Sequence, residues 1–216
     1  MPKDEVSASL LLRAYQMGVF PMAETRGQSD VFWVDPTERG VLPLDGFHLS
    51  RSLKRSILKT PFRASLNQDF RGVVQACAAR EETWINDTIF DLYMELHEWG
   101  YAHSLEIWHD EALVGGVYGV AMGQAFFGES MFSRRRDTSK IALAWLVAHL
   151  STCGFTLFDT QFLTDHLASL GGVEVGRKAY HNMLSNALRA PADINAHPLP
   201  DAYSVVQRIT QTSKRE

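Results

Sequence analysis

The sequence predicts an α+β fold, with a small N-terminal domain over residues 1–46 and a larger C-terminal domain over residues 47–216. Two observations support this prediction. Two segments of helical periodicity precede three consecutive β-rich runs joined by short turns, and one more helix and one more strand follow them. This order differs from the regular strand and helix alternation of a parallel α/β sheet, so we expect an antiparallel meander with helices packed on it.

The N-terminal domain is expected to open with a short helix. Leu11, Leu12 and Tyr15 recur at helical spacing, and Gly18 follows them as a C-terminal cap. Over residues 19–48, proline and glycine interrupt short apolar pieces, which favours turns and brief strands over long elements.

The C-terminal domain is expected to contain three helices and four strands. Apolar side chains recur at helical spacing over residues 70–77 and 89–96, and Asn86 provides an N-cap for the second of these helices. A third helix is expected over residues 139–154. The expected strands are AHSLEIWH, ALVGGVYGV, QAFFGESMF and FTLFDTQF.

The composition limits the classes of function that the chain can have. Its 216 residues are 45% hydrophobic, and 21% are charged with a net charge of -4, so any contact with nucleic acid must be a local basic patch. No apolar stretch reaches the roughly 20 residues of a membrane helix, and no signal peptide is recognisable, which favours a cytoplasmic protein. Cys77 and Cys153 lie in apolar helical surroundings and are expected to be inert core thiols.

Residues 49–63 carry the strongest local charge excess in the chain. The segment contains five basic residues and no acidic residue. It is either a solvated helix face or a patch that binds the phosphate backbone of a nucleic acid. The basic residues are Arg51, Lys54, Arg55, Lys59 and Arg63.

Three polar residues lie in strongly apolar strands and are candidates for chemistry. Asp159 and Gln161 are two residues apart and should share one face of their strand, while Glu129 is flanked by large apolar residues. Each could instead make a structural hydrogen bond. A carboxylate beside a carboxamide can bind an incoming amine and assist its loss of a proton, as acyl transfer to nitrogen requires.

The loop before the third expected helix of the C-terminal domain is a candidate anion site. Arg134, Arg135 and Arg136 precede a helix N-terminus, where free N-H groups and the helix dipole favour phosphate. The loop RRRDTSK contains no glycine, unlike the pyrophosphate loop of N-acetyltransferases of the common GNAT fold, so coenzyme A is a poor ligand candidate. We expect no cofactor and no metal site, because the spacing of His97, His103 and His109 fits no ligand pattern.

The chain resembles the leucyl/phenylalanyl-tRNA-protein transferase family over nearly its whole length. The blocks that carry the resemblance occur in the same order as in the family. They are AYQMGVFPM, FWVDPTERG, SRSLKR, TWI, LHEWGYAHSLEIW, LVGGVYG, FFGESMFS, TSKIAL, FDTQF and HLASLGG.

The resemblance implies a GNAT-like C-terminal domain with a mixed, largely antiparallel sheet flanked by helices. It implies transfer of Leu or Phe from aminoacyl-tRNA to the N-terminal Arg or Lys of a protein, which then enters bacterial N-end-rule degradation. We expect the protein to carry out this transfer as a monomer and without a membrane. Two alternatives remain: an acetyl-CoA-dependent N-acetyltransferase of the same fold, and a non-catalytic RNA-binding module.

The resemblance also assigns residues to each part of the expected site. Among the departures from the family, Met22 stands where some members carry Trp, and we expect weaker stacking on the terminal adenosine. The implied residues are Glu129, Asp159 and Gln161 at the reacting centre; Val117, Phe126, Ser130 and Leu143 around the amino acid; Trp84 and Met22 at the adenosine; and Arg51, Lys54, Arg55, Arg134 and Arg135 at tRNA phosphates.

Overall fold

The computed structural model describes residues 6–22, 32–79 and 83–212. Its strands are β1 (Phe20–Met22), β2 (Phe32–Val34), β3 (Glu38–Val41), β4 (Phe62–Leu66), β5 (Ala102–His109), β6 (Ala112–Met122), β7 (Ala125–Ser133), β8 (Leu157–Gln161) and β9 (Val173–Gly176). Its helices are α1 (Ala8–Gln16), α2 (Arg51–Lys59), α3 (Phe70–Ala78), α4 (Asp87–Glu98), α5 (Thr138–Thr152), α6 (Asp165–Ala168), α7 (Arg177–Ala187) and α8 (Ala202–Thr212).

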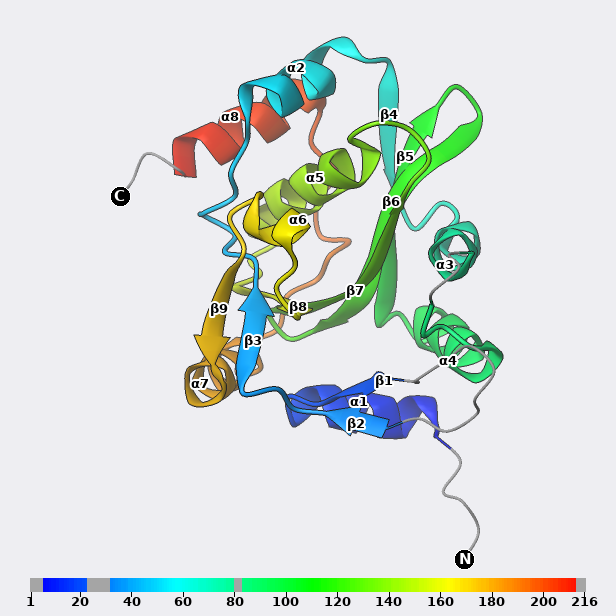
Figure 1. Cartoon of the computed structure of the whole chain (residues 1–216), viewed down its shortest axis with the longest axis vertical. Helices are drawn as coiled ribbons and strands as arrows, with labels where there is room; N and C mark the ends of the chain where they lie inside the picture. The colour runs from blue at the N-terminus through cyan, green and yellow to red at the C-terminus, as the bar shows by residue number, and fades with distance from the viewer. Residues whose placement is uncertain (1–5, 23–31, 80–82, 213–216) are drawn as a thin grey trace, which may run out of the picture.

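A seven-stranded sheet in the order β4-β5-β6-β7-β8-β3-β9 organises the molecule (Figure 1). Every neighbouring pair is antiparallel except β7 and β8, which run parallel. The predicted α+β class and the mixed, largely antiparallel sheet are therefore confirmed. The predicted meander corresponds to β5, β6 and β7, whose connecting turns place Asp110 and Gly123 in the left-handed region.

The sheet separates two hydrophobic cores because successive side chains of its strands point to opposite faces. On β6, Tyr118 packs in the core beneath α1, α3 and α4, and Val117 packs in the core beneath α2, α5 and α8. Helix α5 lies between the sheet and the pair α2 and α8, so most of its circumference is buried. A helix buried in this way is apolar all round.

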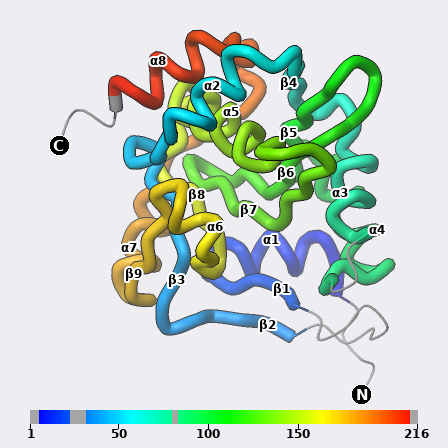
Figure 2. Tube along the Cα trace, turned by 45° about the horizontal axis from the view of Figure 1, so that its top comes forward, coloured from blue at the N-terminus to red at the C-terminus, as the bar shows by residue number. Residues whose placement is uncertain are grey.

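The small sheet of β1 and β2 lies at one end of the molecule beside α1, and α2 and α8 lie at the opposite end (Figures 1 and 2). The expected short helix and brief strands of the N-terminal segment are thus present as α1, β1 and β2. Strand β3 falls within residues 1–46 but pairs with β8 and β9 of the large sheet. The domain boundary at residue 46 stays a prediction.

Two further expectations concern the whole chain. Within the part of the chain that the structure describes, no helix is both long and apolar enough to cross a membrane. Cys77 and Cys153 are buried in the two hydrophobic cores, as the sequence predicts.

Candidate active site

The candidate site lies where the parallel strands β7 and β8 part. Their pairing runs from Ala125 opposite Leu157 to Phe127 opposite Asp159 and then ends, although β7 continues to Ser133. A small cavity of about 60 Å³ opens in this gap. The residues that line it are Val117, Gly128, Glu129, Ser130, Met131, Leu143, Phe158, Thr160 and Leu167.

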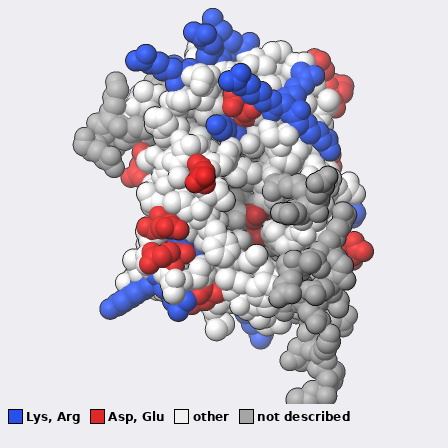
Figure 3. Space-filling view, in the orientation of Figure 1, with Lys and Arg blue, Asp and Glu red and all other residues white. Residues whose placement is uncertain are grey.

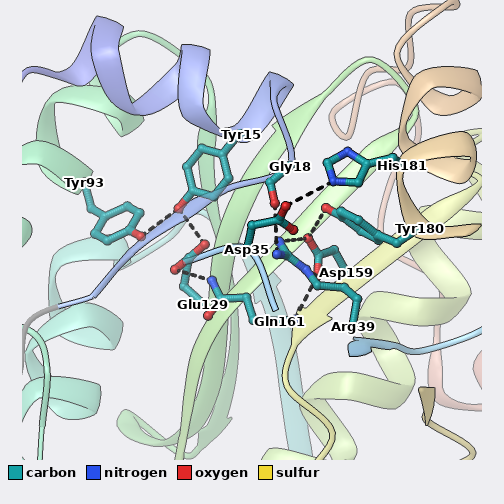
Figure 4. A network of polar contacts seen from close by, with 10 residues as sticks. All are labelled: Tyr15, Gly18, Asp35, Arg39, Tyr93, Glu129, Asp159, Gln161, Tyr180 and His181. Carbon is teal, nitrogen blue, oxygen red and sulfur yellow. Dashed lines mark hydrogen bonds and ion pairs between the residues drawn. The ribbon is translucent and has the colours of Figure 1, made fainter. Parts of the chain in front are cut away.

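Glu129 lies at this gap, and the described residues that donate hydrogen bonds to it are neutral (Figure 4). Its Oε1 accepts a 2.6 Å hydrogen bond from the hydroxyl of Tyr15, and its Oε2 accepts a 3.0 Å bond from Nε2 of Gln161. The hydroxyls of Tyr15 and Tyr93 are 2.8 Å apart. Because Tyr15 gives its only hydroxyl proton to Glu129, Tyr93 donates to Tyr15.

Burial dominates the titration of Glu129. It raises the pKa of this carboxyl from 4.5 to about 7, and the hydroxyls of Tyr15 and Tyr93 and the carboxamide of Gln161 oppose that rise only in part. A carboxyl with such a pKa can gain or lose a proton near neutral pH, which is the requirement for a general acid or base.

Asp159 is completely buried and is held by a different set of donors. Its Oδ1 accepts from Nε of Arg39 at 2.9 Å and from the backbone N-H of Gln161 at 2.8 Å. Its Oδ2 accepts from Nη2 of Arg39 and from the hydroxyl of Tyr180, both at 2.6 Å. The arginine and the carboxylate thus form a bidentate ion pair.

Arg39 reaches this position from β3 and is itself 1% exposed. Its guanidinium lies 4.5 Å from the ring centroid of Phe20 and 4.4 Å from that of Tyr180, and its Nη1 donates to the backbone oxygen of Gly18. Two aromatic rings and two acceptors therefore surround a buried cation.

The structure brings Asp159, Gln161 and Glu129 together, but the side chains of Asp159 and Gln161 point to different partners (Figure 4). Asp159 faces Arg39, while Gln161 stands at the end of β8 with a left-handed φ of 64° and turns its carboxamide to Glu129. The sequence reasoning missed Arg39, Tyr15, Tyr93 and Tyr180 as members of this cluster. One signal was available for Arg39 alone, since it directly precedes the apolar residues 40–42 and a buried cation requires a partner, but that signal does not identify the partner.

Three of the four expected pocket residues, Val117, Ser130 and Leu143, line the cavity directly. Phe126 is buried behind them, and its ring meets that of Phe158 edge-on with centroids 5.3 Å apart. Phe158 itself lines the cavity, so Phe126 supports the cavity wall from the second layer.

The two expected adenosine residues lie on the opposite side of the sheet from α5. Met22 and Trp84 are partly buried and pack against the hydrophobic core that contains Tyr15 and Tyr93. The Trp84 ring meets the Tyr93 ring edge-on at 6.4 Å. Met22 and Trp84 therefore pack against the same hydrophobic core as Tyr15 and Tyr93, the tyrosines near Glu129.

Four of the five basic residues expected over residues 49–63 lie on α2, and Arg63 lies on β4. Ser50 caps this helix, Leu53 and Ile57 face the core, and the remaining face carries the exposed side chains of Arg51, Lys54 and Arg55. Lys and Arg side chains gather at this end of the molecule (Figure 3).

The arginine loop directly precedes α5, as the sequence predicts. Arg134, Arg135 and Arg136 are exposed. Arg134 donates to the backbone oxygen of Leu113 and lies over the ring of Phe132, and Arg136 is 3.6 Å from Asp137. Among the described residues, no group of three or more His, Cys, Asp or Glu side chains could hold a metal ion.

Comparison with known proteins identifies the family of the chain. A model described as "Leucyl/phenylalanyl-tRNA protein transferase" matches residues 41–185, and the model of that family's N-terminal domain matches residues 4–37. The chain belongs to the leucyl/phenylalanyl-tRNA protein transferase family. The first family model begins within β3 and the second ends directly before it, and β3 is the first strand of the large sheet along the chain.

Relatives within the family are similar over their full length. The chain is 62% identical to the leucyl/phenylalanyl-tRNA-protein transferase of Ruegeria sp. (strain TM1040), over 96% of this chain and 99% of the relative. It is 58% identical to the protein of that name from Cereibacter sphaeroides (strain ATCC 17025), over 99% and 100%. Among solved structures, L-PGS from Bacillus licheniformis matches with a TM-score of 0.44 and 14% identity, over 83% of this chain and 66% of that one.

Proposed function

We propose that the protein transfers Leu or Phe from aminoacyl-tRNA to the α-amino group of an N-terminal Arg or Lys of a protein. Membership of the transferase family supports the class of reaction. The observation that carries the chemistry is the buried contact between Glu129 and Gln161 beside a small apolar cavity. This arrangement offers a proton acceptor next to a space for a short apolar side chain.

The reaction forms one bond and breaks another. The acceptor amine attacks the ester carbonyl of the aminoacyl-tRNA, the new amide bond forms, and the ester bond to the 3′-terminal ribose oxygen breaks. The amine loses a proton, and the released ribose oxygen gains one. Glu129 is suited to accept the first proton, since the described residues donate one hydrogen bond to each of its oxygens and a carboxylate offers about four acceptor positions.

The cavity supports selection of Leu or Phe by size and polarity. Val117, Leu143 and Phe158 give it an apolar wall, and among the described lining residues the side-chain hydroxyls are those of Ser130 and Thr160. A β-branched side chain would clash, and each methylene missing from a smaller side chain would lose roughly 1 to 3 kcal/mol of binding.

The tRNA is proposed to bind at two separate surfaces. Trp84 and Met22 hold the terminal adenosine by stacking and apolar contact, and the α2 residues Arg51, Lys54 and Arg55 meet backbone phosphates, with Arg134 and Arg135 as further phosphate contacts. Recognition through phosphates is independent of base sequence. The protein acts as a monomer in the cytoplasm, where charged tRNA is available, and directs its substrates to N-end-rule degradation.

A direct transfer assay tests this function. The protein is incubated with tRNA carrying labelled leucine and a peptide that begins with Arg, with a matched peptide that begins with Glu as the control. We expect label on the first peptide alone. No transfer to either peptide would refute the proposal, and acetylation of the peptide from acetyl-CoA would replace it with the N-acetyltransferase alternative.

A further inference from the structure

Asp159 has no acceptor position left for a substrate proton. Each of its two oxygens already accepts two hydrogen bonds, all between 2.6 and 2.9 Å, from Arg39, Tyr180 and the backbone of Gln161. A carboxylate offers about four acceptor positions, so this one is saturated. Its burial also leaves it out of contact with solvent. An incoming amine would have to displace one of these donors to reach it.

The position of Gln161 depends on Asp159. Gln161 adopts a left-handed φ of 64°, a region that residues other than glycine seldom occupy, and its N-H donates to Oδ1 of Asp159. The same turn directs its carboxamide to Glu129. The carboxylate therefore stabilises a backbone conformation that aims a side chain at the neighbouring acid.

Strand β3 contains Arg39 and packs closely against the turn at Gln161. Gly40 pairs with Gln161, and a Cβ at Gly40 would come within 2.5 Å of the backbone carbon of Phe162. The adjacent Arg39 is clamped between Phe20 and Tyr180. The arginine and the turn thus occupy fixed places relative to each other.

We propose that Arg39 and Tyr180 are positioning residues of the transfer reaction, and that they hold Asp159 so that it fixes the Gln161 turn instead of accepting a proton. The proposal rests on the proposed function, because the effect is measured on transfer. In this scheme the amine meets Glu129 and Gln161, and Asp159 acts through Gln161 alone. The hydrogen bond from Gln161 also lowers the pKa of Glu129, which gives a second readout.

A charge-neutral double variant separates positioning from proton acceptance. In Asp159→Asn alone, Arg39 stays buried without its counter-charge, and we expect a large loss of kcat. Adding Arg39→Gln removes that charge, and the new carboxamide oxygen at position 159 can still accept from the N-H of Gln161. We expect the double variant to be at least tenfold more active than Asp159→Asn. Equal inactivity of the two, with both folded by circular dichroism, would overturn the proposal.

Tyr180→Phe decides the question if the double variant fails to fold. It deletes one hydrogen bond to Asp159 and keeps the ring over Arg39. We expect kcat to fall about tenfold with KM for leucyl-tRNA unchanged, and the midpoint of the pH dependence of kcat to move to higher pH. Simple destabilisation would not move that midpoint. Tyr203→Phe, at a tyrosine that is 73% exposed on α8, is the matched control.

The outcomes separate this proposal from the function on which it rests. If the wild type transfers label and Tyr180→Phe matches Tyr203→Phe in both kcat and midpoint, the positioning proposal is wrong and the function stands. If the wild type transfers nothing, the function is wrong, and the positioning proposal falls with it.

Discussion

Replacement of Glu129 by Gln is predicted to change how the stability of the protein depends on pH. Burial raises the pKa of this carboxyl in the folded state to about 7, against 4.5 in the unfolded chain. The folded protein therefore holds a proton that the unfolded chain has already lost. Below pH 4.5 both states are protonated and the stabilisation is complete. It is lost progressively as the pH rises from 4.5 through 7.

The size of the effect follows from the two pKa values. Each pKa unit corresponds to about 1.4 kcal/mol, so complete ionisation of Glu129 lowers the free energy of unfolding by about 3 kcal/mol. Between pH 5 and pH 8 the change is about 2.5 kcal/mol by the same relation. Glu129 is 8% exposed, so solvent screening reduces this figure little.

The measurement is urea unfolding of wild type and Glu129→Gln at pH 5 and pH 8. His103 opposes Glu129, because its buried ring has a pKa of about 4 and stabilises the fold as the pH rises through 6.5. The informative quantity is therefore the difference between the two proteins. We expect that difference to change by about 2.5 kcal/mol in favour of the variant at pH 8.

Glu111→Gln provides the control, since Glu111 is exposed in the turn between β5 and β6. Its unfolding free energy should follow that of the wild type at both pH values. If Glu129→Gln also follows the wild type, burial of Glu129 does not raise its pKa and the assignment of Glu129 as the proton acceptor loses its physical basis.

Three further predictions concern substrate binding. Arg51→Ala should reduce the slope of the log-log salt dependence of tRNA binding by about one unit. Arg189→Ala, at an exposed position away from α2, should leave that slope unchanged. Equal slopes for the two variants would place the tRNA elsewhere. Trp84→Ala should raise KM for leucyl-tRNA by roughly tenfold or more, since base stacking on an aromatic ring contributes about 1 to 3 kcal/mol, and an unchanged KM would contradict the adenosine assignment. Val117→Leu should narrow the cavity and shift the ratio of kcat/KM for leucyl-tRNA over phenylalanyl-tRNA about tenfold in favour of Leu, and an unchanged ratio would move the amino acid out of this cavity.

Local patterns in the sequence were sufficient for much of the fold. Alternation and turn residues predicted β5, β6 and β7, and helical periodicity predicted α3, α4 and α5. These elements depend on contacts between near neighbours in sequence. Strand β3 could not be placed in the same way. It is four residues long, and its partners β8 and β9 lie more than a hundred residues further along the chain.

The same reason explains which part of the site was predictable. Glu129, Asp159 and Gln161 are polar residues inside apolar strands, so each was visible as an anomaly in its own segment. Arg39 lies in an irregular segment and is 120 residues from Asp159, so only the fold reveals the pair. A short segment of sequence contains no signal for a partner at that distance.

The buried partners of the two carboxylates give them different chemistry. Asp159 meets a full positive charge on Arg39, which compensates the charge of the carboxylate and fixes its orientation. Within the described residues, the hydrogen bonds to Glu129 come from the neutral groups of Tyr15 and Gln161, and the nearby charge of Asp159 makes its ionisation harder still. Without a compensating cation, the Glu129 carboxyl can exchange a proton near neutral pH. In the proposed scheme the site needs both carboxylates, because Asp159 aims the carboxamide of Gln161 at the carboxyl of Glu129, which exchanges the proton.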